Sequence, residues 1–161
     1  MKIKFNNILK EQEEIITLPP FHYFDNDWNL VLELSEGKPF KILGNVDLSN
    51  NQKITTLGNC YAVGGFLDLF NCKNLQSLES LTVVGGYLYL ENCTNLQSLG
   101  NLTEVGGDLN LDDCQNLESL GNLTEVGGSL GLRNTPIAKT MTENKIRQQV
   151  NVGGKIYLFW V

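Results

Sequence analysis

Positive charge is scarce in this sequence. Lys and Arg together number 12, against 18 Asp and Glu, and the formal net charge is −6. Proteins that hold nucleic acid or anionic membranes through their charge need clustered Lys and Arg to neutralise phosphate groups, whereas the basic residues here are scattered. We therefore expect neither a nucleic-acid partner nor a membrane partner.

Long apolar runs are also missing. No stretch is long enough to span a bilayer as a helix. The chain starts with two lysines among its first four residues, but Asn6 and Asn7 follow where a signal peptide needs an apolar segment. The expected location is cytoplasmic, or the virion or host cell if the chain is phage-encoded.

Histidine occurs once, as His22, so no Ser-His-Asp or Cys-His pair can form without that residue. The acidic pairs Asp112-Asp113 and Asp25/Asp27 lack the spacing of a calcium-binding loop. We therefore expect no enzyme activity, no metal site and no cofactor. The four cysteines are read as reduced thiols, as is usual in a chain that is not secreted.

The sequence does contain a repeat. Gly-Gly pairs begin at Gly64, Gly85 and Gly106, 21 residues apart, and three cysteines recur at the same interval. A fixed period of this length is typical of a solenoid. Alignment of the neighbouring coils places Asn51 and Thr135 in the cysteine column, whose other members are Cys72, Cys93 and Cys114.

Each coil combines two spacings. Leucines two residues apart, such as Leu88 and Leu90, point to one face of a strand. Apolar residues three apart then predict a tight irregular arc, and 21 residues leave no room for a full helix as well. Stacking the coils would align the strands into a parallel sheet, at about 4.8 Å per coil, with leucine ladders inside.

The chain divides into three segments within a single domain. Residues 1–42 do not follow the repeat and are expected to cap the first coil, with short strands at 2–5 and 29–34 and a weak helix at 7–15. Residues 43–135 carry the repeats. Residues 136–161 are expected to form an inserted helix at 140–150, with Thr142 as its N-cap, and a final strand that continues the inward ladder at Ile156 and Leu158.

The two most regular columns are interpreted as scaffold. The Gly-Gly pairs turn the chain into each strand, either through positive φ angles or by allowing coils to pack closely. A phosphate-binding loop is the weaker interpretation, because it would need a Lys together with a Ser or Thr, and a helix after them. The cysteine column suits a small residue that bonds loop backbone between coils, although a redox or metal role stays open. Cys60 falls in a leucine column and is read as an apolar filler.

From about residue 43 to residue 158 the chain resembles the leucine-rich repeat superfamily. The run Leu88-x-Leu90-x-x-Cys93 and its copies carry the likeness, and the coils are similar to those of receptor L domains and of glycine-paired bacterial and phage proteins. Gly85 stands where the first leucine of the family pattern would be, and Leu96 comes one residue late. The resemblance implies a mostly β, right-handed solenoid of about five to six coils and, as a class tendency, protein or ligand binding.

The residues between the leucines are the candidate binding site, because they should point to solvent and aromatic side chains there are costly unless something covers them. A cover by the N-terminal cap, or stacking between neighbouring strands, would also explain the aromatics. The candidate partner-binding residues are Phe66, Asp68, Phe70, Tyr87, Tyr89, Glu91, Asp108, Asn110, Asp112 and Tyr157.

Three functions are consistent with this surface. The first is binding of a protein partner. The second is a structural or assembly subunit, such as a phage virion component, that associates with itself through its cap and its C-terminal edge strand. The third is glycan binding, with the tyrosines stacked on sugar rings.

Overall fold

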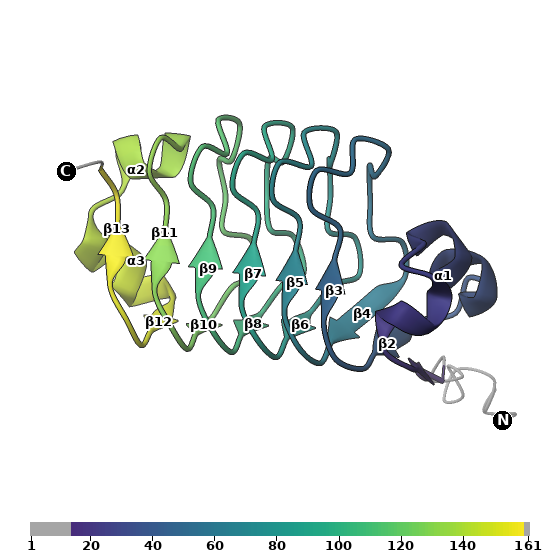
Figure 1. The fold of residues 1–161 in the computed structure, drawn as a ribbon. Coiled ribbons are helices and arrows are strands. Elements are labelled where there is room, and N and C mark those ends of the chain that lie inside the picture. Colours follow the sequence, from purple (N-terminus) through teal and green to yellow (C-terminus); the bar gives the residue numbers. More distant parts are fainter. Residues whose placement is uncertain (1–13, 160–161) are drawn as a thin grey trace, which may run out of the picture.

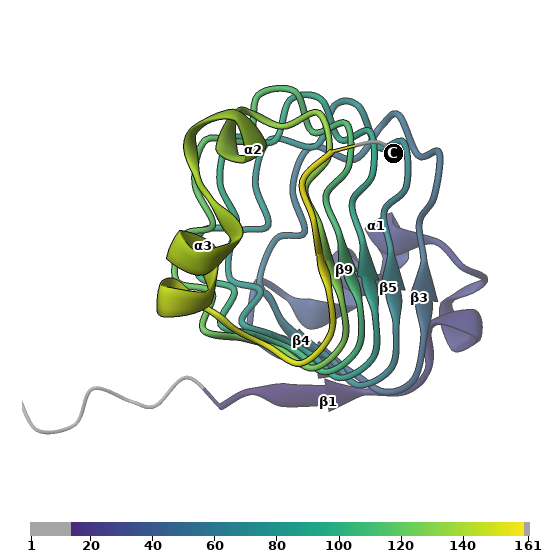
Figure 2. The same cartoon turned by 90° about the vertical axis from the view of Figure 1, so that its left-hand side faces the viewer.

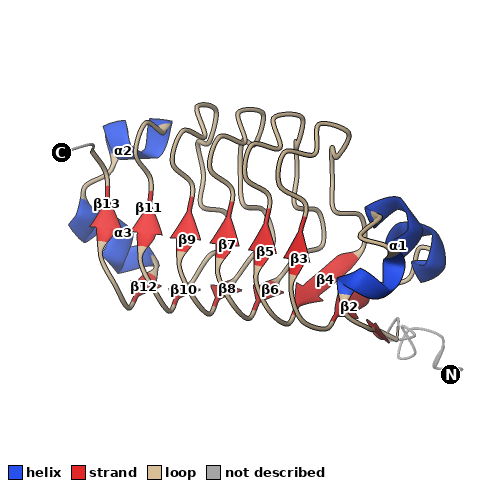
Figure 3. Cartoon of the chain, in the orientation of Figure 1, coloured by secondary structure: helices blue, strands red, loops and turns tan. Residues whose placement is uncertain are grey.

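The computed structural model describes residues 14–159, which form two all-parallel sheets joined coil by coil (Figures 1 and 3). The seven-stranded sheet contains, in spatial order, β1 (Ile16–Leu18), β2 (Phe40–Ile42), β4 (Cys60–Val63), β6 (Val83–Val84), β8 (Glu104–Val105), β10 (Glu125–Val126) and β12 (Asn151–Val152). The six-stranded sheet contains β3 (Val46–Asp47), β5 (Leu67–Asp68), β7 (Leu88–Tyr89), β9 (Leu109–Asn110), β11 (Leu130–Gly131) and β13 (Ile156–Tyr157).

The predicted solenoid with a parallel sheet is therefore confirmed, and a second parallel sheet accompanies the predicted one. The strands before the Gly-Gly pairs pair with one another, for example Val84 with Val105, and make the second sheet. Within the repeats from β6 onward these strands are only two residues long. A strand of that length cannot show the alternation by which a strand is recognised in a sequence.

Stacked leucines fill the space between the sheets and the arc. The register pairs Leu67 with Leu88, Leu88 with Leu109, and Leu109 with Leu130. All four are at most 1% exposed. Each coil thus buries its apolar side chains against the equivalent ones of its neighbours, which a single coil could not do.

The Gly-Gly pairs are needed for close packing between coils. None of their members is among the described glycines with a positive φ angle. A Cβ atom at Gly85 would overlap the carbonyl oxygen of Gly64 in the preceding coil, and one at Gly106 would overlap that of Gly85. Of the two explanations offered by the sequence, close approach of the backbones is the correct one.

The N-terminal cap is helical where a strand is expected. Residues 29–34 lie within α1 (Trp28–Ser35), which follows a 3₁₀ helix, η2 (Phe21–Phe24). Asp27 caps α1 by accepting a hydrogen bond from the Asn29 N–H at 2.9 Å. The buried side chains are Trp28, Val31 and Ser35, at helical spacing, whereas Leu34 is 53% exposed. Leu30, Leu32 and Leu34, which alternate along this segment, are therefore not its buried residues.

The expected C-terminal helix is confirmed in a shorter form, α3 (Glu143–Gln149), whose N-cap Thr142 accepts a hydrogen bond from the Lys145 N–H. A second helix, α2 (Pro136–Thr140), precedes it and is capped by Thr135. Figure 2 shows both helices on the side of the last coil away from the six-stranded sheet.

Some expectations fall on other parts of the chain. The strand at residues 2–5 and most of the helix at 7–15 lie outside the described residues, and Glu14 and Ile15 have no regular structure. Among the described helices none has the length and apolar character to cross a membrane.

Candidate functional site

The candidate site is the outward face of the six-stranded sheet. Its predicted residues lie on or beside four strands: β5, β7, β9 and β13. In Figure 1 these strands lie in front, and the capping helix α1 lies beyond β3 at one end of the row. The cap therefore does not cover the central strands of this face.

Three aromatic rings form a continuous row across two neighbouring coils. Phe66 stacks on Tyr87 with ring centroids 4.6 Å apart and an interplanar angle of 4°. Tyr87 stacks in turn on Tyr89, at 4.3 Å and 23°. The three side chains are half-buried, whereas Phe70 is 37% exposed. Cross-strand stacking thus accounts for part of the aromatic stripe, and the row still has one side toward solvent.

Carboxylates border the aromatic row. Oδ1 of Asp68 accepts the Phe70 N–H at 2.9 Å, and Oε2 of Glu91 accepts the Asn110 side-chain amide at 3.0 Å. Partial burial raises the pKa of the Tyr87 hydroxyl, and the negative charge of Asp68 adds to this effect. Asp68 thus places a negative charge close to Tyr87 in the aromatic row.

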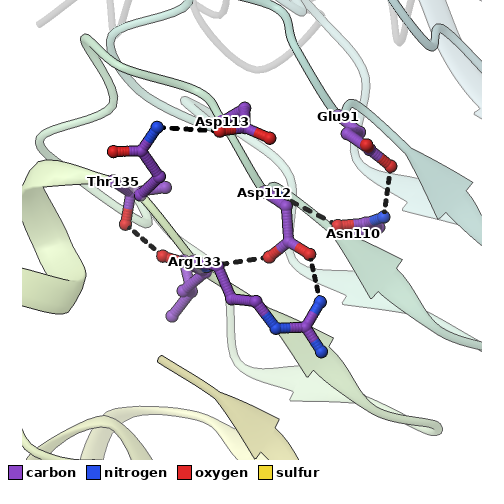
Figure 4. Close-up of polar contacts among 8 residues, drawn as sticks. Glu91, Asn110, Asp112, Asp113, Arg133 and Thr135 are labelled. Carbon is purple, nitrogen blue, oxygen red and sulfur yellow. Dashed lines mark hydrogen bonds and ion pairs between the residues drawn. The ribbon is translucent and has the colours of Figure 1, made fainter. Parts of the chain in front are cut away.

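Asp112 departs from the expectation that it faces solvent. It is 2% exposed, and its Oδ2 pairs with Nη1 of Arg133 at 2.6 Å. Its Oδ1 also accepts the Arg133 N–H at 2.8 Å, while its own N–H donates to Oδ1 of Asn110. The Arg133 guanidinium lies 4.6 Å from the ring centroid of Tyr157. Figure 4 shows this chain from Glu91 to Arg133, which ties three successive coils together.

A hollow of about 170 Å³ lies on this face, between the rings of Tyr89 and Tyr157. Ser129 and Gly131 leave it open, because neither has a large side chain. Gly131 is buried, and a Cβ atom there would come within 2.9 Å of both Asn110 Oδ1 and Asp112 Oδ1. The residue must be small for the Asp112 side chain to reach Arg133, and the hollow results.

Asp108 provides the charge at the edge of the hollow. Its Oδ1 accepts the Ser129 N–H at 2.7 Å. Within residues 14–159, no hydrogen bond or ion pair engages its Oδ2, so one carboxylate oxygen remains available to a ligand.

An asparagine column beside the site was not singled out from the sequence. Asn50, Asn71, Asn92, Asp113 and Asn134 all have φ between 55° and 62°. Asn71 donates its side-chain amide to Asn50, and Asn92 to Asn71, at 2.8 and 2.7 Å. Their regular position, one residue before each member of the cysteine column, is a sequence signal for this second column.

The cysteine column has the predicted scaffold geometry. The thiols of Cys72, Cys93 and Cys114 donate to carbonyl oxygens of the preceding coil at 3.0–3.2 Å, and all three are buried. Burial raises the pKa of each thiol, that of Cys114 to about 12. Thr135 instead donates its hydroxyl to Leu132 of its own coil at 2.7 Å. Cys60 is buried in the leucine column, as expected.

The other side chains considered for catalysis or metal binding do not lie together. His22 is exposed, and its ring packs against that of Tyr23 in a tilted arrangement. Over the described part of the chain, no three His, Cys, Asp or Glu side chains are grouped so that they could hold a metal ion.

Comparison with known proteins found no similarity: no family model, no curated protein and no solved structure matches this chain.

Proposed function

We propose that this protein is a non-enzymatic repeat scaffold that binds a protein partner through the outward face of its six-stranded sheet. The stacked row of Phe66, Tyr87 and Tyr89 is the observation that carries the proposal. Rigid aromatic side chains contribute large contact areas at low entropic cost, and they are enriched in protein interfaces. Their stacking fixes the rings before any partner arrives, which reduces the entropy lost on binding.

The solenoid supports this role. Its backbone hydrogen bonds run from coil to coil, such as Leu67 N–H to the Tyr87 carbonyl at 3.0 Å, so the face is one stiff surface. The sheet strands point their other side chains into a leucine core that needs no help from the exposed residues. Apart from the Asp112–Arg133 pair, the residues on the face are thus free to differ between coils without loss of the fold. They are mainly aromatic on or beside β5 and β7, and acidic beside β9.

We also infer that the chain is a short-repeat relative of the leucine-rich repeat superfamily. The 21-residue coils, the leucine ladders and the Cys/Asn column at the end of each strand support that relationship.

The test is affinity capture with a matched pair of variants. Tyr87→Ala combined with Tyr89→Ala should reduce capture of a partner at least about tenfold, the loss expected from a central aromatic anchor. Tyr61→Ala is the control, because Tyr61 is an exposed tyrosine, at 37%, that belongs to β4 in the other sheet. Both proteins should unfold cooperatively. Equal capture by the double variant and the control would disprove the proposal.

A second candidate is self-association through the C-terminal end. Strands β12 and β13 are the last strands of their sheets among the described residues, and Phe159 beyond β13 is 68% exposed. An unpaired strand edge beside exposed apolar side chains favours pairing with another chain. Light scattering across a concentration series distinguishes the two candidates, since a monomer at all concentrations excludes assembly.

A further inference from the structure

The outward face already holds one guanidinium group, and its surroundings show what such a group needs there. Arg133 lies between the carboxylate of Asp112, at 2.6 Å, and the ring of Tyr157, at 4.6 Å from the centroid. The two partners come from strands on either side of it, β9 and β13. A cation on this face is thus held by one carboxylate and one tyrosine ring.

The other side of the hollow has the same two groups without a cation. The ring of Tyr89 lines it, and Asp108 on the next strand supplies a carboxylate whose Oδ2 has no partner within residues 14–159. Ser129 and Gly131 leave the space in front of them open. Arg133 also lines the hollow, but its guanidinium is paired with Asp112. Over the described residues, Asp108 is a carboxylate of the lining that forms no ion pair.

The charge of the face favours the same kind of ligand. Asp68, Glu91 and Asp108 lie on or beside β5, β7 and β9, and over the described residues none of them forms an ion pair. The positive charge of Arg133 is offset by Asp112. A basic ligand would meet carboxylates that accept hydrogen bonds but are not neutralised by a cation, whereas an acidic ligand would be repelled.

The size of the hollow limits the ligand to a small group. Its volume of about 170 Å³ is well below the roughly 300–1,000 Å³ of pockets for drug-sized molecules. The two tyrosine-bearing strands are three strand steps apart, or about 14 Å between backbones. One extended side chain fits between them.

We propose that this hollow binds an arginine side chain from a basic segment of the partner protein, with the guanidinium on the Tyr89 ring and its N–H groups on Asp108. The inference rests on the proposed function, because it names the chemistry of the partner at the same face. The partner segment crosses the sheet next to the aromatic row and inserts one basic residue where Ser129 and Gly131 leave the face open.

The probe is an acetylated and amidated Gly-Arg-Gly peptide, titrated into the ¹⁵N-labelled protein. We expect the amide signals of Ser129 and Gly131 to shift, with a Kd on the order of 1 mM for a single side chain outside its partner. The same peptide with citrulline, which keeps the shape of arginine but not its charge, should produce shifts at least about fivefold weaker at equal concentration.

Two variants test the residues. Asp108→Asn keeps the Oδ1 acceptor for the Ser129 N–H but removes the charge, and it should weaken peptide binding about fivefold or more. Tyr89→Leu keeps an apolar side chain without the π face and should weaken binding by a factor of about three or more. Glu118→Gln, an equal change of charge at an exposed site on the arc, is the control and should bind as the original protein does.

The outcomes separate this inference from the proposed function. No shift with the arginine peptide at about 20 mM, or equal shifts with citrulline, overturns the inference. Shifts at the same amides with methyl glycosides but not with arginine also overturn it and indicate a sugar site. If the arginine peptide binds but the Tyr87/Tyr89 double variant still captures the partner, the proposed function fails alone. If capture depends on the tyrosines but Asp108→Asn changes nothing, only the arginine site fails.

Discussion

Oδ2 of Asp112 lies 2.6 Å from Nη1 of Arg133, one strand along the six-stranded sheet, and the carboxylate side chain is only 4% exposed. This pair joins the third regular coil to the last one before the C-terminal helices. It also explains the small residue at position 131, and hence the hollow beside it. A structural contact and the candidate binding site therefore depend on the same side chain.

Removal of Arg133 should be costly, because it leaves a buried carboxylate without its cation. We expect Arg133→Ala to lower the free energy of unfolding by about 2–3 kcal/mol, at the lower end for buried pairs since the arginine is partly exposed. Lys38→Ala is the control: its pair with Glu36 spans 4.0 Å at the surface, so the loss should be below about 0.5 kcal/mol. Urea denaturation measures both, and equal losses would contradict the buried-pair explanation.

Replacement of Glu79 by glycine should stabilise the folded protein. Its φ angle is 52°, and it stands in the column of Gly58, Gly100 and Gly121, which have φ angles of 56–59°. A non-glycine residue in the left-handed region costs about 1 kcal/mol, and greater freedom of glycine in the unfolded chain offsets part of the gain. We expect Glu79→Gly to raise the free energy of unfolding by about 0.5 kcal/mol. A decrease would show that the glutamate side chain contributes a contact that outweighs the backbone strain.

Gly106, in the third Gly-Gly pair, should tolerate no side chain. Gly106→Ala places a Cβ atom against the Gly85 carbonyl oxygen. Because backbone atoms cannot move aside, we expect the free energy of unfolding to fall by about 3 kcal/mol or more. Gly100→Ala is the matched comparison, because its Cβ would meet nothing within 4 Å and only its φ angle of 56° opposes the change. The loss there should be about 1 kcal/mol. Thermal unfolding of the two variants separates a steric cost from a conformational one.

The buried thiols should make the protein sensitive to alkali. Burial raises the pKa of Cys60 and of Cys114 to about 12, from a reference value of 9.0. Between these values the unfolded chain loses protons that the folded chain keeps. The free energy of unfolding should therefore fall as the pH rises from about 9 towards 12.

Cys114→Ala provides the control for this effect. Its stability should be lower near neutral pH, because a buried side-chain atom is lost, but should decline less steeply above about pH 9. In the folded protein a thiol reagent should label none of the four cysteines at pH 8, because the thiolate is the reactive form. Rapid labelling of folded protein would show that the column opens to solvent.

The repeat allowed much of the fold to be predicted, because each coil repeats the same local pattern and its leucines can be buried only by stacking. The cysteine column could be assigned to the scaffold for the same reason, since Asn51 and Thr135 share it. The candidate face followed directly, because residues that alternate with buried leucines must point the other way.

Other features depend on contacts that no local pattern records. The helix α1 and a strand fit the same six residues at 29–34, and only packing of Trp28 and Val31 against the first coil selects the helix. The second sheet arises from pairing between coils along strands of two residues. Asp112 is buried because Arg133, 21 residues away in the sequence, lies beside it.

The amino-acid sequence alone thus determines the period, the inward leucines and the glycine turns, because these are short-range patterns repeated in every coil. The tertiary structure decides which residues of the outward face stay open to solvent. The aromatic stripe predicted between the leucines is a stacked row on β5 and β7, and the acidic stripe is partly engaged by Arg133. Exposure depends on neighbours brought together by stacking, and those neighbours differ from one coil to the next.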